Sequence, residues 1–260
     1  MTKKSDTGIW ILLLSFLTIF LFCNCQRKKE GVVFCFDDCY FDEWYAHRAL
    51  FKKYDIRATF FITRPHLLDT NQITKLKKLE SDGHEIGCHG YLHQNATLYQ
   101  IPEDYIDEQI TPSFQKLQEM GFDVKSFAYP FGASTNDLDS VLLNYFLTIR
   151  KATYNMQDTT IDQYPEIYAN KNNYRIVNSM GIDYNYSITF ENFETGIKRA
   201  LKNNEILVLH AHRIDTLYSA YTIHPEYLEG LFLLCKKYRI QSVTMGGMYN
   251  YFQKNNKFHN

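Results

Sequence analysis

Two pairs of residues in this chain have the types and spacing that metal-dependent acid–base chemistry requires. Asp37 and Asp38 are adjacent and follow a short apolar run, and His89 and His93 are four residues apart in His-Gly-Tyr-Leu-His. Taken singly, each pair also suits helix capping or exposure to solvent. Together, one aspartate and two histidines offer the ligands that Zn²⁺, Co²⁺, Ni²⁺ or Fe²⁺ prefers. The remaining aspartate is then a base beside that cation.

Two further features occur where apolar segments end. The run 206–210 is apolar up to its last residue, His210, which by itself suits a hydrogen-bonded core histidine better than a catalytic one. The segment 129–132 reads Tyr-Pro-Phe-Gly, in which proline and glycine force a sharp turn. Such a turn either aims a backbone N–H into a cleft or simply punctuates a loop.

Apolar and amphipathic segments alternate after residue 30. We expect strands over 32–36, 58–63, 84–89, 127–129, 147–152, 174–177, 206–210 and 242–245. We expect helices over 44–54, 73–79, 105–120, 137–146, 191–202 and 225–238, and a loop over 155–173. Alternation of strands and helices predicts a parallel α/β fold, either a closed barrel or an open sheet.

The pattern as a whole resembles the polysaccharide deacetylases, the NodB-like group of carbohydrate esterase family 4. The resemblance runs from about residue 31 to residue 247. It is carried, in order, by Phe36-Asp37-Asp38, Ala58-Thr59-Phe60-Phe61, His89-Gly90-Tyr91-Leu92-His93, Ala128-Tyr129-Pro130-Phe131-Gly132 and Val208-Leu209-His210. The resemblance implies an irregular (β/α)7 barrel, a deformed TIM-like barrel. Strand ends far apart in sequence converge at the mouth of such a barrel.

The resemblance also implies a role for each matched polar residue. Asp38, His89 and His93 would hold one divalent metal ion, with Zn²⁺ expected and Co²⁺ or Ni²⁺ as alternatives. Asp37 would be the general base and His210 the general acid. The implied reaction is hydrolytic deacetylation of an N-acetylated sugar in a polysaccharide or oligosaccharide.

Other groups are expected around the reacting acetyl group. The resemblance implies that the Phe131 backbone N–H helps to stabilise an oxyanion and that Val208 borders the pocket for the acetyl methyl. Tyr40, Trp44, Tyr91 and Tyr129 lie beside motif residues and could stack on sugar rings. Partly buried aromatic residues would give the same pattern.

The chain departs from the family pattern at several positions. Ala128 stands where the family often has an arginine that orients the base, and Arg150 or Arg175 is expected to replace it from a neighbouring strand. Asp183 is only a weak candidate for the acid of the family's fourth motif. His212, two residues past the predicted general acid, is expected to be an ordinary surface histidine, with support of the site residues or metal ligation as the alternative.

The N-terminus resembles a bacterial lipoprotein signal. Two lysines precede an apolar run over 9–22, and Cys23 or Cys25 follows as a candidate lipidation site; an uncleaved anchor is the alternative. Export to the cell envelope and membrane anchoring are therefore expected. The predicted organisation is a signal peptide over 1–24, a linker over 25–30, the barrel domain over 31–250 and a tail over 251–260.

Composition excludes some partners and leaves rival functions open. Lys and Arg number 28 and Asp and Glu number 29, so there is no basic excess to attract nucleic acid. We expect a monomer whose partner is the glycan substrate. The rivals are an O-acetyl esterase on the same scaffold, a degenerate relative that binds glycan without hydrolysis, and an iron oxygenase with the same ligand set.

Overall fold

Seven parallel strands form a closed barrel in the computed structural model, which describes residues 30–154 and 159–256. They are β1 (Gly31–Asp38), β2 (Ala58–Ile62), β3 (Glu85–Cys88), β4 (Ser126–Ala128), β5 (Thr148–Thr153), β7 (Ile176–Gly181) and β8 (Ile206–Ala211). β8 pairs with β1, and this pairing closes the barrel. The predicted irregular (β/α)7 barrel is confirmed.

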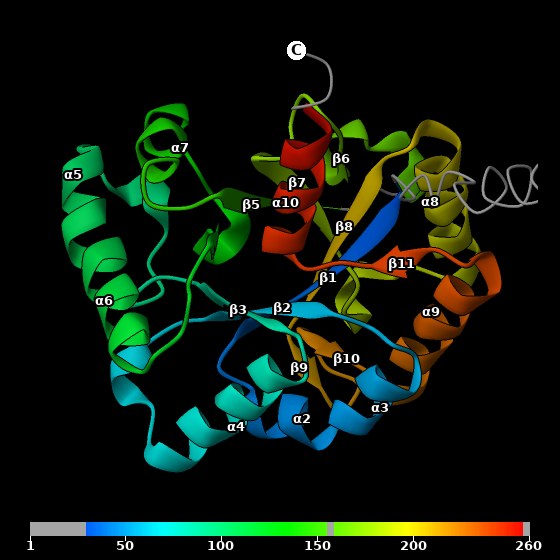
Figure 1. The fold of residues 1–260 in the computed structure, drawn as a ribbon, viewed down its shortest axis with the longest axis horizontal. Coiled ribbons are helices and arrows are strands. Elements are labelled where there is room, and N and C mark those ends of the chain that lie inside the picture. The colour runs from blue at the N-terminus through cyan, green and yellow to red at the C-terminus, as the bar shows by residue number, and fades with distance from the viewer. Residues whose placement is uncertain (1–29, 155–158, 257–260) are drawn as a thin grey trace, which may run out of the picture.

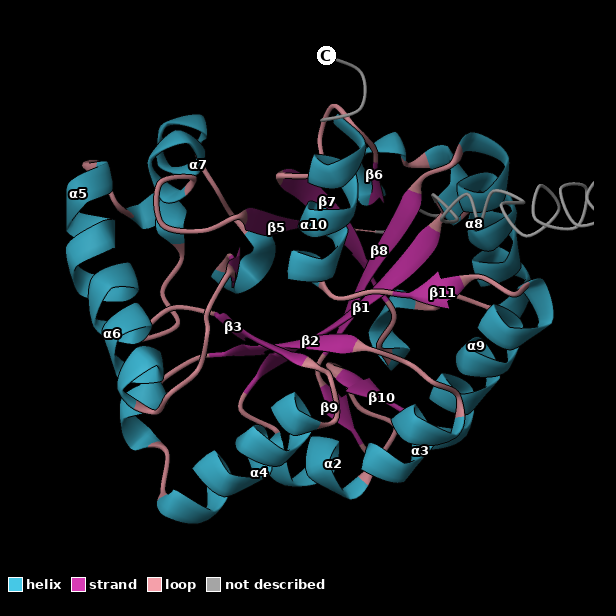
Figure 2. Ribbon diagram, viewed as in Figure 1, coloured by secondary structure: helices cyan, strands magenta, loops and turns pink. Residues whose placement is uncertain are grey.

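Helices surround the strands (Figures 1 and 2). They are α2 (Phe41–Ala46), α3 (Arg48–Lys53), α4 (Thr70–Ser81), α5 (Pro102–Tyr105), α6 (Thr111–Glu119), α7 (Asn136–Leu142), α8 (Phe190–Asn203), α9 (Pro225–Tyr238) and α10 (Met245–Asn256). Local sequence explains their ends. Asp69 and Gln72 form a capping box at the start of α4, and α8 ends at Asn204 in the left-handed conformation.

The barrel is irregular at its seams. β3 and β4 pair through a single residue pair, Cys88 with Phe127. Two short strands join the sheet outside the ring: β11 (Gln241–Ser242) alongside the start of β1, and the antiparallel β6 (Tyr168–Ala169) alongside β8. A separate pair, β9 (Arg213–Ile214) and β10 (Thr222–Ile223), follows β8.

Alternation along β1 separates two buried clusters. Phe34 and Phe36 belong to the larger cluster of apolar residues packed with the helices, whereas Val33 and Cys35 belong to the smaller cluster inside the barrel. Successive side chains of a strand point to opposite faces, so Asp37 continues the inward row. A carboxylate therefore stands at the carboxyl end of the barrel interior.

α10, red in Figure 1, packs against the inner cluster. Met245, Met248 and Phe252 are buried there. The predicted strand over 242–245 is wrong beyond Ser242, because Met245 begins this helix, and the helix continues past the boundary at 250 that was expected to start a tail. The apolar pattern at 243–245 suits a buried helix start as well as a strand.

Two predicted helices are interrupted. The helix expected over 44–54 divides at His47 into α2 and α3. The helix expected over 105–120 contains a π-helical turn, η3 (Ile106–Ile110), between α5 and α6. The loop expected over 155–173 includes β6 and two short 3₁₀ turns.

The predicted leader over 1–24 lies outside the described residues, so it stays a prediction. Among residues 30–154 and 159–256, no helix has the length and apolar character that crossing a membrane requires.

Candidate active site

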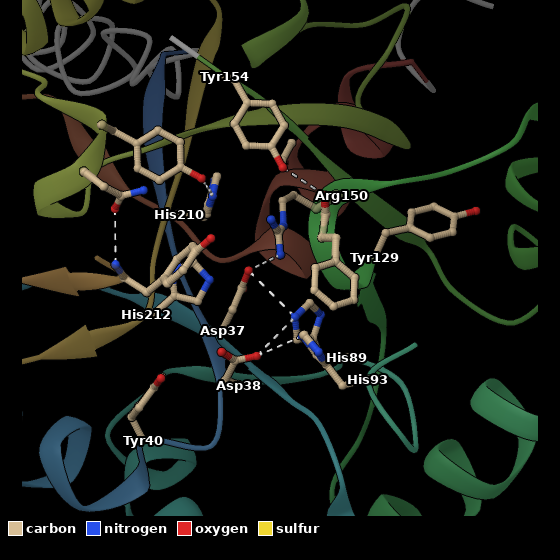
Figure 3. Close-up of a pocket in the computed structure, with 16 residues that line it drawn as sticks. Asp37, Asp38, Tyr40, His89, His93, Tyr129, Arg150, Tyr154, His210 and His212 are labelled. Atoms are coloured by element: carbon tan, nitrogen blue, oxygen red, sulfur yellow. Dashed lines mark hydrogen bonds and ion pairs between the residues drawn. The ribbon is translucent and has the colours of Figure 1, made fainter. Parts of the chain in front are cut away.

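A cavity of about 220 Å³ lies where the carboxyl ends of the barrel strands meet (Figure 3). Asp37 and Asp38 reach it from β1, while His89 and His93 come from the loop after β3. His210 comes from β8. The structure thus brings together the polar residues that the sequence places at the ends of separate strands.

Asp38, His89 and His93 have ligand atoms that all lie within 4.8 Å of one another. Asp38 Oδ1 is 3.1 Å from His93 Nε2 and 3.7 Å from His89 Nε2. Tetrahedral ligands at zinc-like bond lengths are separated by about 3.4 Å. The spacing and the donor atoms therefore fit one divalent cation.

The tautomer of His89 also fits this role. Its Nδ1 lies 2.8 Å from the Ala128 carbonyl oxygen, which can only accept a hydrogen bond. Nδ1 therefore carries the proton, and Nε2 is left with a lone pair for a cation. Burial lowers the pKa of His89 to about 4, which keeps the imidazole neutral.

The π-helical turn η3 holds the loop between the two histidines. The backbone oxygen of Gln109 accepts a hydrogen bond from Tyr91 N–H, and its buried side chain accepts one from Leu92 N–H. A π-turn is rare and frequently occurs at functional sites. Nothing in the sequence pattern pointed to Gln109, because a helical period does not reveal a π-turn.

Asp37 is held by an arginine from another strand. Its Oδ2 is 2.5 Å from Arg150 Nη2 in a fully buried ion pair, while Oδ1 is buried without a hydrogen-bond partner. Burial alone would raise the pKa of Asp37, but the Arg150 guanidinium and His89 outweigh it and bring the pKa below its usual value. Arg175, the other candidate, instead donates to the backbone oxygens of Leu143 and Leu147.

Three site residues have a left-handed backbone. Asp38, His93 and Phe131 have φ values of 83°, 59° and 60°. In non-glycine residues this conformation costs on the order of 1–3 kcal/mol each and tends to occur at functional sites. The Phe131 ring packs on the His93 ring with centroids 4.7 Å apart.

His210 is buried, and both of its nitrogens have partners. Ser179 donates its only hydroxyl proton to the Lys151 carbonyl, so His210 Nδ1 must be the donor to Ser179 Oγ, 2.9 Å away. His210 Nε2 then accepts from the Tyr186 hydroxyl at 3.3 Å. Burial, followed by the charge of Arg150, lowers the pKa of His210 well below its usual value.

His212 contrasts with His210. Its Nδ1 donates to Asp183 Oδ2 over 2.7 Å, its backbone N–H donates to Asp183 Oδ1 over 3.0 Å, and its ring lines the cavity beside Asp37 and Asp38 (Figure 3). Burial works against protonation of His212, but the hydrogen bond and charge of Asp183 outweigh it and raise the pKa. The expectation that His212 is an ordinary surface histidine is wrong.

Comparison with known proteins points to a family. A family model described as polysaccharide deacetylase matches residues 24–150, which include Asp37, His89, His93 and Arg150. Over this part, just under half of the 260 residues, the chain is similar to the polysaccharide deacetylases. YheN of Bacillus subtilis, which its name assigns provisionally as a polysaccharide deacetylase, is 29% identical over 120 residues. That alignment covers 46% of this chain but only 40% of YheN, well under two thirds of its length.

Solved structures of polysaccharide deacetylases and esterases share the fold. The chitin deacetylase of the fungus Colletotrichum lindemuthianum superposes with a TM-score of 0.57, at 16% identity, over 84% of this chain and 87% of its own. A family 4 acetyl xylan esterase from Clostridium thermocellum, solved with a cobalt ion, gives 0.53 at 20% identity over 84% and 90%. At these identities the likeness shows the fold alone.

Several predicted substrate contacts are corrected by burial. Trp44 is 0% exposed and donates from Nε1 to the His212 carbonyl, so its ring cannot stack on a sugar. Tyr129 borders the cavity, but its ring is fully buried and points away from the histidine ligands (Figure 3). Val208 lies inside the barrel below His210, and the Tyr91 ring packs at a tilt on the half-buried His66; neither Val208 nor Tyr91 lines the cavity.

Besides Tyr129, the tyrosine and phenylalanine side chains that line the cavity are Tyr40, Phe131, Tyr154, Tyr186 and Tyr221. Tyr40 was predicted as a sugar contact and Phe131 lies in a family motif, whereas Tyr154, Tyr186 and Tyr221 come from segments without one. Ser179 and Asp183 were missed or underrated for a related reason. β7 reaches Gly181, beyond the predicted end at 177, because Ser-Met-Gly weakens the apolar pattern. Ser179, a polar residue on the inward face of this strand, was the sequence signal that could have pointed to the site.

Proposed function

We propose that this chain is a metal-dependent hydrolase that removes acetyl groups from N-acetylated sugars in a polysaccharide or oligosaccharide. One observation carries the proposal. A two-histidine, one-aspartate cation site faces a buried carboxylate with one unpaired oxygen, and an aspartate-paired histidine lines the same cavity. This set supplies an electrophile, a base and an acid around one small space.

The cation is proposed to be Zn²⁺, with Co²⁺ or Ni²⁺ as alternatives, held by Asp38, His89 and His93. Such an ion polarises an acetyl carbonyl and lowers the pKa of a bound water towards neutrality. The cobalt ion in the Clostridium thermocellum esterase supports this assignment by analogy of fold.

Asp37 would act as the base. Arg150 holds Oδ2 and keeps the carboxylate ionised, while the unpaired Oδ1 is available to accept a proton from the attacking water. An iron oxygenase with the same three ligands would leave this buried, ionised carboxylate without a task.

His212 is a better candidate for the acid than His210, which the family pattern suggested. An amide nitrogen must be protonated to leave, and the donor must be charged at working pH. Asp183 raises the pKa of His212 and fixes Nδ1, so that Nε2 is the nitrogen left to face the cavity. His210 has a lowered pKa and both nitrogens engaged, so we propose that it positions Ser179 and Arg150.

Phe131 would contribute its backbone N–H to the oxyanion formed when water adds to the carbonyl. Its strained, left-handed backbone lies at the cavity and above a histidine ligand. A preorganised donor of this kind lowers a barrier by roughly 3–4 kcal/mol.

The choice between amide and ester substrates needs experiment, because both pass through the same tetrahedral geometry. One neighbour in fold is named a chitin deacetylase and another an acetyl xylan esterase. We favour the amide because the His212–Asp183 pair supplies a charged acid, which an amine leaving group needs more than an alkoxide does.

We further propose that the chain is exported and anchored to a membrane by lipid on Cys23 or Cys25. The apolar run over 9–22 followed by cysteine supports this. Loss of the protein from the membrane fraction in the Cys23→Ser/Cys25→Ser double variant would support lipidation, and unchanged partitioning would contradict it.

Acetate release tests the function. The full chain, loaded in turn with Zn²⁺ and Co²⁺, is assayed on peptidoglycan, chitooligosaccharide, poly-N-acetylglucosamine and acetylxylan. Release from an N-acetylated polymer, with loss of release but retention of metal in Asp37→Asn, supports the proposal. Release from acetylxylan alone would make the protein an esterase, and release from none would leave a glycan-binding relative.

A further inference from the structure

A second cleft adjoins the catalytic cavity. It has a volume of about 540 Å³ and lies between the turn η7 (Tyr184–Tyr186), the loop before β10 and the start of α9. We call it the tyrosine cleft and define it by Tyr184, Asn185, Leu217, Tyr218 and His224. Of the residues with a proposed role at the acetyl group, Asp183 alone borders the tyrosine cleft.

The tyrosine cleft exposes aromatic surface that has been arranged in advance. Tyr184 and Tyr218 are 61% and 70% exposed, and their ring centroids are 5.4 Å apart. The Tyr218 ring stacks on His224 at 5.2 Å with an interplanar angle of 8°, so its orientation is supported from one side. Leu217 beside it is 58% exposed. Contiguous exposed apolar surface of this kind marks a binding site.

Only a narrow ridge separates the tyrosine cleft from the catalytic cavity. Asn185 lines both, and its Oδ1 accepts a hydrogen bond from Tyr221 N–H over 3.2 Å. Tyr221 has a left-handed backbone (φ 59°), its ring packs on His212 in the catalytic cavity, and the next residue, Thr222, lines the tyrosine cleft. Asn185 and Tyr221 thus form the ridge that separates the catalytic cavity from the tyrosine cleft.

The chemistry of the tyrosine cleft suits an uncharged, hydroxylated ring. Among the residues that the structure describes, Asp183 is the only carboxylate on its wall, and both of its oxygens are already bonded to His212. Hydroxyl groups of Ser187, Thr189 and Thr222 stand among the aromatic rings. A pyranose presents C–H faces that pack on aromatic rings and hydroxyls that bond to such groups.

We propose that the tyrosine cleft is a subsite for a neighbouring sugar ring of the glycan whose acetyl group occupies the catalytic cavity. This inference builds on the proposed function and makes the protein an enzyme of oligomeric or polymeric glycans rather than of single sugars. The chain of the glycan crosses the Asn185–Tyr221 ridge, and ring stacking on Tyr218 and Tyr184 holds it.

Dependence on substrate length tests the subsite. Acetate release is measured for the full, metal-loaded chain on the dimer and the pentamer of β-1,4-linked N-acetylglucosamine. We expect Tyr218→Ala to lower the pentamer-to-dimer ratio of kcat/KM about tenfold, and Tyr184→Ala less, because the dimer cannot fill the tyrosine cleft as fully. Tyr218→Phe keeps the ring and should restore the ratio. Tyr145→Ala, at a 42% exposed tyrosine after α7, is the matched control and should leave the ratio unchanged.

Binding to the Asp37→Asn variant separates failure of the subsite from failure of the proposed function, since it needs no turnover. Calorimetric titration should show tighter binding of the pentamer than of the dimer, and Tyr218→Ala in this background should remove the difference. Equal affinities or an unaffected difference would overturn the subsite alone, whereas no binding of either oligomer would overturn the proposed function together with the subsite. If Tyr218→Ala weakened binding to phosphatidylglycerol vesicles but left the affinity for the pentamer intact, the cleft would be a membrane-binding surface. That result would also overturn the subsite.

Discussion

The two sides of the site differ in how closely they follow the family. The cation side, with Asp38, His89 and His93, lies wholly within the matched residues 24–150. The proton-donor side, with Asp183 and His212, lies outside them, on β7 and β8 and the segments that follow. The cation side thus carries its motifs inside the match, and the proton-donor side lies beyond it.

Geometry explains the difference. A cation needs three ligand atoms at fixed separations, so the residues that carry them tolerate little change in spacing. A proton donor needs only a charged imidazole within reach of the leaving nitrogen, and several strand ends of a barrel can supply it. The arginine that holds Asp37 illustrates this freedom. Ala128 and Arg150 are register partners on β4 and β5, so an arginine displaced by one strand still points into the barrel.

The largest effect is expected on the cation side. His89→Ala removes a proposed ligand whose Nδ1 is bonded to the Ala128 carbonyl and whose Nε2 would bind the metal, so both metal content and acetate release should fall to background. Elemental analysis by mass spectrometry and the acetate assay measure the two losses. His47→Ala, at a histidine between α2 and α3, is the matched control and should lose neither. Full metal occupancy in His89→Ala would show that the cation lies elsewhere.

The proton-donor side is tested by its two histidines. His212→Ala should lower kcat about 10²–10⁴-fold on an amide substrate with metal retained, because the leaving nitrogen loses its acid. His210→Ala should cost less, since His210 only positions Ser179 and Arg150. Steady-state kinetics on one N-acetylated substrate compares them. The reverse order would return the acid role to His210 and align this side with the family pattern.

The sequence was a good guide to the barrel and to the cation side. Alternating apolar segments and motif order predicted the strands and the convergence of Asp38, His89 and His93, because contiguous motifs encode those positions locally. The sequence could not reveal that Trp44 and Tyr129 are buried, since their burial depends on helices distant in the chain. It also could not rank His210 against His212. That ranking depends on Asp183, about 30 residues earlier, meeting His212 across the strand ends.

Arg150, which holds Asp37, tests how freely the arginine can be placed among the barrel strands. Arg150→Ala removes the charge that holds the pKa of Asp37 down, so the acid limb of the pH profile should move to higher pH and activity should fall about 10–100-fold. An unpaired buried Asp37 should also cost about 3–5 kcal/mol of unfolding free energy, measured by urea titration.

Adding Ala128→Arg to Arg150→Ala should restore part of both losses, because position 128 faces the same interior beside position 150. Arg175→Ala, whose side chain bonds to backbone oxygens away from Asp37, is the control for removing an arginine and should not move the acid limb. No recovery in the double variant would mean that the position of the arginine is as tightly fixed as that of the metal ligands.

The smallest expected effect is a shift in pH dependence from the pairing of Asp183 with His212. The acid must be protonated, so activity is present below the pKa of His212 and is lost as pH rises through it. Asp183 raises that pKa, and Asp183→Asn should therefore move the alkaline limb of kcat/KM to lower pH while leaving the acid limb, set by Asp37, in place. At pH 6 the loss should stay under about tenfold and then grow as pH increases.

An alkaline limb that does not move in Asp183→Asn but moves in Tyr186→Phe would place the acid at His210, because Tyr186 contacts that histidine. The proton-donor side would then be conserved in position after all, with only its supporting residues exchanged.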